Sequence, residues 1–347
     1  MNKLLLLLLF TPIIGFSQYA SIPDQLFEKE LIRLGYDNKI DGKVKTKNIK
    51  DVTSLELYVA TEDMGEAVWS DADEEWHLTG IKDLTGIEGF TSLTHLEIIG
   101  NHDMGSVLGV LDLSNNIALK ELYFDNHYNG LVETLDLSKN TTLEILSCRG
   151  SSFKKLDVSQ NTLLTYLNCS GNNLVDLNLS QNKLLINLDC SGNYLKKLGI
   201  NQNSALTSLQ CEYNIIKSLD ISQNIALKTL SCYKNKLTRL DVRQNTLLTS
   251  LVCYENKLTK LDVRQNTLLT SLDCGGNNIK NLDVSQNTLL NYLNCRNNKL
   301  TRLHLNNNIL LTRLFCSDNQ LTSLDLRNNK AIKYPSFERN NFDKPIR

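Results

Sequence analysis

Nine cysteines are the residues of this 347-residue chain whose spacing most suggests chemistry. They are Cys148, Cys169, Cys190, Cys211, Cys232, Cys253, Cys274, Cys295 and Cys316, and every interval is 21 residues. Cysteines form disulfides in exported proteins, and thiolates bind metal ions. A metal site needs ligands that converge from one loop, as in C-x-x-C. Stacked in-register side chains do not present adjacent Cβ atoms as a disulfide prefers, and nine is odd. We therefore predict a row of buried, free thiols.

Acidic residues offer a second possible chemistry in the segment EDMGEAVWSDADEEWHLTG. Asp71, Asp73, Glu74 and Glu75 carry the oxygen ligands that calcium prefers. An acidic surface loop has the same composition without an ion, and we adopt that interpretation. The sequence therefore predicts no metal and no cofactor, with these four residues as the secondary metal candidates.

The histidines do not form a recognisable catalytic motif. His95 and Glu97 fall on one expected strand, with Glu121 and Asp125 about one coil away, and we interpret them as exposed polar strand residues. The chain has no G-x-S-x-G, H-E-x-x-H or P-loop pattern. The segment LDVRQNTLLTSL also occurs unchanged at 240–251 and 261–272. Copying a coil extends a surface but adds nothing to an active site, so we predict that the protein is not an enzyme.

The repeat that positions the cysteines approximates LxxLxCxxNxLxxLDVSxN. In each half, the central L-x-C or L-x-L alternates inward and outward, as a short strand requires. The asparagine that follows can bond backbone groups left open where the chain turns. We therefore expect a mainly β solenoid, with a small helical N-terminal cap.

The repeats resemble the bacterial 21-residue class of leucine-rich repeats with nested 10- and 11-residue halves, called IRREKO, as in LTSLDCGGNNIKNLDVSQN. The resemblance covers roughly residues 81–329. It implies a leucine-rich-repeat solenoid of short parallel strands on two sides. It also implies no catalytic residues, because the family motif is a packing motif. The N-terminal region, with LTGIEGFTSLTHL at 84–96, is similar to the capped start of exported bacterial repeat proteins of the internalin type.

Five regions are expected along the chain. Residues 1–18 read as a signal peptide, with Lys3, an apolar run and small residues before the cleavage site. We assign 19–80 to the cap and acidic loop, where SIPDQLFEKELIRLGY predicts an amphipathic helix. Irregular repeats follow at 81–142, regular ones at 143–329, and a cap or tail at 330–347. The mature chain is expected to have no transmembrane segment and to be secreted, periplasmic or non-covalently bound to a cell surface.

Outward-facing residues vary between copies and are the candidates for binding. The first candidate patch contains Tyr213, Tyr233, Lys234, Val252, Tyr254 and Glu255; the second contains Tyr292, Arg296, Arg313 and Phe315. Aromatic side chains with a few charges are typical of binding hot spots. A formal net charge of −1 argues against nucleic acid. We predict a scaffold for protein–protein interaction or adhesion; a glycan-binding module and a metal-dependent enzyme using the N-terminal acidic and histidine residues are the alternatives. The sequence does not predict an oligomeric state.

Overall fold

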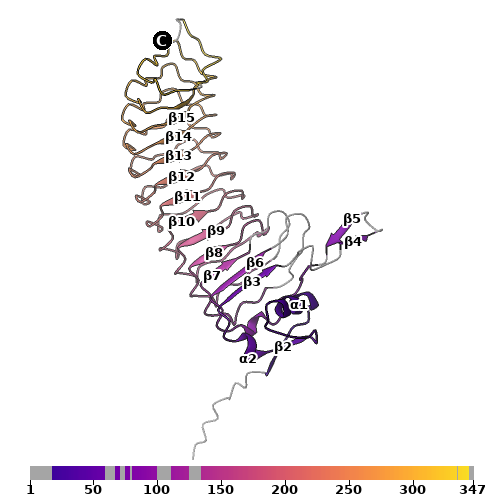
Figure 1. Ribbon diagram of the computed structural model, residues 1–347. Helices are drawn as coiled ribbons and strands as arrows, with labels where there is room; N and C mark the ends of the chain where they lie inside the picture. The colour runs from indigo at the N-terminus through magenta and orange to yellow at the C-terminus, as the bar shows by residue number, and fades with distance from the viewer. Residues whose placement is uncertain are drawn as a thin grey trace, which may run out of the picture.

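The computed structural model describes residues 18–58, 67–70, 75–78, 80–99, 111–124, 134–333 and 335–343. It forms a stack of coils that rises from an N-terminal cap, shown in indigo and purple, to the C-terminus in yellow (Figure 1). Residues 1–17 of the expected signal peptide, and the candidate ligands Asp71, Asp73 and Glu74, lie outside the described residues. Among the described residues, no helix has the length and apolar character needed to cross a bilayer.

The cap contains the expected amphipathic helix. Helix α1 spans Gln25–Arg33, and the carboxylate of Asp24 caps it by accepting the backbone N–H groups of Leu26 and Phe27 at 2.9 and 3.1 Å. Phe27 and Leu31 are fully buried on its inner face. Strands β1 (Tyr19–Ser21) and β2 (Lys43–Lys45) pair antiparallel beside it, and α2 (Thr46–Ile49) follows. The cap thus covers the apolar start of the first coil, as a solenoid end requires.

One twelve-stranded parallel sheet runs the length of the stack. Its strands are β3 (Ser54–Tyr58), β6 (His95–Ile99), β7 (Glu121–Tyr123), β8 (Ile145–Ser147), β9 (Tyr166–Asn168), β10 (Asn187–Asp189), β11 (Ser208–Gln210), β12 (Thr229–Ser231), β13 (Ser250–Val252), β14 (Ser271–Asp273), β15 (Tyr292–Asn294) and β16 (Arg313–Phe315). Pairing is in register, so Leu188 lies between Leu167 and Leu209. The predicted solenoid is confirmed.

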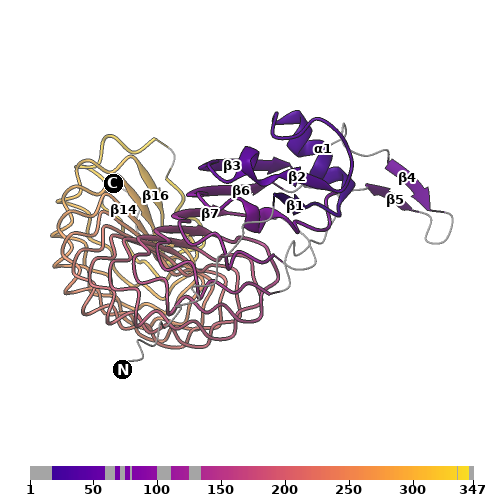
Figure 2. The same ribbon diagram turned by 90° about the horizontal axis from the view of Figure 1, so that it is seen from below.

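Two short elements lie outside this sheet. Strands β4 (Ala67–Ser70) and β5 (Glu75–Leu78) pair antiparallel as a hairpin that projects from the cap end (Figure 2). A single 3-10 turn, η1 (Ile87–Gly89), precedes β6 and buries Ile87.

The second side of the coil differs from the expected second row of strands. In the described residues it forms isolated parallel bridges, such as Leu198 with Leu219, rather than strands of several residues. The reason is local: the Asp220 carboxylate accepts the backbone N–H of Ser222 at 3.0 Å and closes a turn at once. The same short turn recurs at Asp157 and Asp283. The extended backbone therefore ends after about one residue on this side.

The core is a continuous column of leucine and cysteine. None of the nine cysteines is in a disulfide and all are fully buried, which agrees with the prediction of thiols rather than disulfides. Each follows the end of a strand, as Cys169 follows β9. The described C-terminal residues extend the column, because Ser336 bridges to Phe315 and Asn340 repeats the asparagine contacts of the coils before it.

Two rows of buried asparagines join the coils. On the cysteine side, Asn193 Oδ1 accepts the backbone N–H of Leu174 at 2.9 Å, and Nδ2 donates to the carbonyl oxygens of Cys169 and Cys190 at 3.0 and 3.2 Å. On the other side, Asn203 Nδ2 donates to the carbonyl oxygens of Leu179 and Asn182 at 3.1 and 2.7 Å. These amides satisfy backbone groups that the turns leave open, as the sequence predicted.

Candidate binding surface

The first candidate patch, called here the tyrosine patch, consists of Tyr213, Tyr233, Lys234, Val252, Tyr254 and Glu255. It lies at the C-terminal ends of β11, β12 and β13, on three successive coils, with Val252 as the last residue of β13. The rings of Tyr233 and Tyr254 stack with centroids 4.3 Å apart and planes at 12°. The Tyr213 ring meets Tyr233 edge-on at 5.1 Å. The in-register sheet therefore brings the three rings into one contiguous cluster, as their positions in the repeat predicted.

Charged groups complete the tyrosine patch. Lys234 Nζ lies 4.7 Å from the centroid of the Tyr213 ring, 3.2 Å from its hydroxyl oxygen and 3.9 Å from the Glu255 carboxylate. The hydrogen bond to Tyr213 is the main cause of a raised pKa at Lys234. Burial, with a smaller contribution from Glu212, raises the pKa of Tyr233 well above its usual range. The patch is thus an aromatic cluster flanked by one lysine and one glutamate side chain.

The backbone beneath the patch is strained at three successive coils. The second residue after each cysteine adopts a left-handed conformation, and glycine occupies this position in Gly171, Gly192 and Gly276. In the patch, Tyr213, Lys234 and Glu255 hold φ angles of 51°, 50° and 51°, and beyond it Asn297 and Asp318 hold the same position at 52° and 55°. A residue with a Cβ costs about 1–2 kcal/mol in this conformation, and such strain clusters at functional sites. The chain thus places large side chains where its own repeat accepts glycine.

The second candidate patch, called here the Phe315 patch, contains Tyr292, Arg296, Arg313 and Phe315. The Tyr292 and Phe315 rings lie 5.8 Å apart and are tilted by 51°. Tyr292 also directs its hydroxyl toward the Asp273 carboxylate, at an oxygen–oxygen distance of 3.5 Å. The Phe315 patch therefore spans β15 and β16, and its Tyr292 reaches back to Asp273 on β14.

Asp273, which the sequence did not single out, joins the two patches. Asn294 Nδ2 donates to its Oδ2 at 3.1 Å, and the backbone N–H of Gly275 donates to Oδ1 at 3.2 Å. Burial raises the pKa of this carboxyl despite those hydrogen bonds. A half-buried carboxylate of this kind is a specific acceptor for a donor on a ligand.

Two hollows meet at Asp273. One of about 680 Å³ extends from Tyr254 and Glu255 past Asp273 to Arg296. The other, of about 410 Å³, is lined by Val252, Asp273, Tyr292 and Arg313 among others. The two patches and Asp273 thus form one surface, which we call the binding face. Asp273 could have been found from the sequence, because the residue before each cysteine faces outward and differs from coil to coil.

The aspartates of the second side have another role. Asp241 and Asp262 each accept the backbone N–H two residues later and bind the guanidinium of Arg243 or Arg264. The hydrogen bond from Arg264 holds the pKa of Asp262 at about 2. These carboxylates stabilise the turns that they belong to. The aspartates of the second side are therefore a structural feature of the coil rather than a ligand site.

Solved structures of other proteins share this fold. No protein-family model and no curated protein matches the chain. An internalin, InlF, from Listeria monocytogenes aligns with a TM-score of 0.73 at 24% identity, over 93% of this chain and 91% of the other. A leucine-rich-repeat protein of Leptospira interrogans aligns with a TM-score of 0.63 at 22% identity, over 85% and 86%. At these identities the two structures show the fold alone.

The functional domain of InlJ from Listeria monocytogenes is more similar in sequence. It has a TM-score of 0.74 and 30% identity, over 94% of this chain and 73% of that domain, and it is described as including a cysteine ladder. The buried cysteine row from Cys148 to Cys316 is the corresponding feature here. By this identity and coverage, together with the capped parallel solenoid, the chain belongs to the internalin-like family of leucine-rich-repeat proteins.

Proposed function

We propose that the protein is an exported, non-catalytic scaffold whose binding face docks a partner protein. The observation that carries the proposal is the aromatic cluster of the tyrosine patch, in which Tyr213, Lys234 and Glu255 have left-handed backbone conformations. Buried aromatic anchors with a polar rim are typical of protein–protein hot spots. The rigid stack supports the same function, because side chains already fixed in place lose little entropy on binding.

The ring geometry favours a protein over a glycan. Sugars stack on open aromatic faces, whereas Tyr233 already contacts Tyr254 on its face and Tyr213 along another side. Lys234 lies over the face of Tyr213. The Arg296 and Arg313 side chains, both exposed, add donors that suit a carboxylate on a partner protein. The acidic loop at 71–75 remains a predicted surface loop, and export is proposed from residues 1–18.

A pull-down from the native environment tests the function, with wild type, a Tyr233→Ala/Tyr254→Ala double variant and Tyr194→Ala as bait. Tyr194 is a matched control, since it is 55% exposed and lies outside the binding face. We expect wild type and the control to retain a protein that the double variant loses. Retention by all three baits would contradict the assigned surface.

A glycan array probed with the same three proteins covers the alternative. Binding of a saccharide by wild type that the double variant loses would replace the protein partner by a glycan. Far-UV circular dichroism of each variant excludes a change of fold, and none is expected because the rings lie outside the leucine column.

A further inference from the structure

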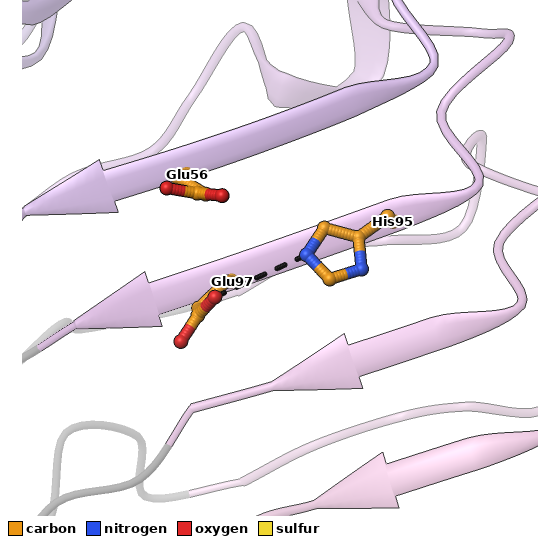
Figure 3. A group of neighbouring side chains, drawn as sticks. All are labelled: Glu56, His95 and Glu97. Atoms are coloured by element: carbon orange, nitrogen blue, oxygen red, sulfur yellow. Dashed lines mark ion pairs between the residues drawn. The ribbon is translucent and has the colours of Figure 1, made fainter.

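A second group of side chains with ligand chemistry lies at the opposite end of the sheet from the binding face. Glu56 on β3 and Glu97 on β6 are direct register partners, and His95 lies two residues before Glu97. Figure 3 shows all three side chains on one face of these neighbouring strands. One ligand atom of each, the histidine nitrogen included, lies within 4.8 Å of the other two.

The charges of this group are unbalanced. Glu56 and Glu97 place two carboxylates directly opposite each other on parallel strands, an arrangement that destabilises a sheet. No lysine or arginine within the described part of the chain forms an ion pair with either of them. The His95 ring is the remaining partner, with Nε2 4.0 Å from Glu97 Oε2. A cation between the carboxylates would remove the repulsion.

The orientation of His95 is fixed from the other side. Its Nδ1 lies 3.0 Å from a carboxylate oxygen of Glu121 on β7, the next strand of the sheet. A carboxylate accepts hydrogen bonds, so this contact favours the tautomer of His95 that carries its proton on Nδ1. In the neutral ring the lone pair then belongs to Nε2, which faces Glu97. This carboxylate–histidine arrangement is the outer-shell contact that orients histidine ligands in metal sites.

We propose that Glu56, His95 and Glu97 bind a zinc ion, with Glu121 positioning His95. One imidazole nitrogen with two carboxylate oxygens suits zinc, whereas calcium and magnesium select oxygen alone. Ligand atoms in tetrahedral zinc sites are about 3.4 Å apart, given bond lengths of about 2.1 Å. Closure from the present spacing needs rotation of exposed glutamate side chains, and Glu56 is exposed. Water fills the fourth position.

Isothermal titration of the full chain, free of any affinity tag, with zinc chloride tests this site. We expect one zinc equivalent in wild type that His95→Ala abolishes and that Glu56→Gln/Glu97→Gln weakens at least tenfold. His304→Ala is the matched control, because His304 is an exposed histidine of the regular array, and it should titrate as wild type. Glu121→Gln should weaken binding about 10–100-fold without removing a ligand.

Two results would overturn the proposal: no zinc binding by wild type, or equal binding by wild type and His95→Ala. Tighter binding of calcium than of zinc would also contradict the ligand chemistry. Because the four residues lie on the sheet surface, the double glutamine variant should keep the wild-type circular dichroism spectrum. Anomalous scattering at the zinc edge from crystals grown with the ion should then place a peak between β3 and β6.

Discussion

Asn235 is bonded to Cys211 across one full coil: its amide nitrogen donates to the Cys211 carbonyl oxygen at 2.9 Å. The same side chain accepts the backbone N–H of Ile216 at 2.9 Å, so it bonds the preceding coil both as donor and as acceptor. Because 24 residues of chain separate Asn235 from Cys211, this contact holds the stack, while bonds from the same amide to the carbonyl oxygens of Cys232 and Tyr233 hold the local turn. The core residues alone would not fix the turns in this way.

Replacing Asn235 with alanine should destabilise the protein markedly. The change leaves the buried Ile216 N–H without an acceptor, at about 1–3 kcal/mol, and removes one of the two amide donors to the Cys211 carbonyl, which Asn214 still bonds. Urea denaturation followed by circular dichroism measures the loss, which we expect near 3 kcal/mol. Lys236→Ala is the control, since that side chain is exposed in the same coil. Equal midpoints for the two variants would contradict the role of the asparagine row.

The nine thiols should be unreactive in the folded protein. They are fully buried, and burial raises the pKa of Cys232 to about 12 and that of Cys316 to about 12. The reactive thiolate is therefore almost absent at pH 8. We expect a thiol reagent to label fewer than one group in native protein and about nine in unreduced, denatured protein. Two or fewer in the denatured chain would show disulfides.

Alkaline pH should destabilise the fold through the same thiols. An unfolded cysteine has a pKa near 8.5, below the folded value of Cys232. The contribution of the buried Cys232 thiol to the free energy of unfolding is thus complete below a pH of about 8.5. It decreases by about 1.4 kcal/mol per pH unit as the pH rises toward the folded pKa of about 12. Denaturation at pH 8, 9 and 10 should show a shallower decrease for Cys232→Ala than for wild type. Parallel slopes would contradict the shift.

The strained positions of the tyrosine patch should show opposed effects on stability and binding. Lys234→Gly and Glu255→Gly relieve left-handed strain, partly offset by the greater freedom of glycine in the unfolded chain, for a net gain of about 0.5–1 kcal/mol. The loss of their exposed ion pair changes little. Both variants should therefore melt higher and bind the partner more weakly.

Lys217→Gly provides the comparison for this pair, as an exposed lysine without a positive φ. It should lower the melting temperature, because glycine then adds unfolded-state entropy without relieving strain. If Lys234→Gly behaves in the same way, the strain does not contribute to stability. If it binds as wild type, Lys234 is not part of the binding face.

The repeat made most of the fold predictable, because a leucine or cysteine at a fixed offset has the same environment in every coil. Cys169 and Asn193 could be assigned from one unit and applied to all. Glu56 could not be connected to His95 in this way, since irregular chain separates them and no period relates their positions. Asp273 was visible as a variable residue, but the bonds that centre it between two patches depend on Tyr292 and Asn294 in the next coil. The left-handed backbone at Lys234 could not be predicted from its own repeat unit, because that unit has no glycine at this position.

Because the strands pair in register, equivalent residues of successive coils lie at a constant interval along the axis of the stack. Each strand advances the stack by about 4.8 Å, so the separation of Tyr254 from Phe315 along the axis is set by the number of coils between β13 and β16. Duplication of one unit moves all later coils along the axis by the height of one coil and leaves the local contacts within each coil unchanged. The two identical copies of LDVRQNTLLTSL show such a duplication of sequence. Such a chain can change the span of its contact surface in fixed steps while each anchor residue keeps its shape.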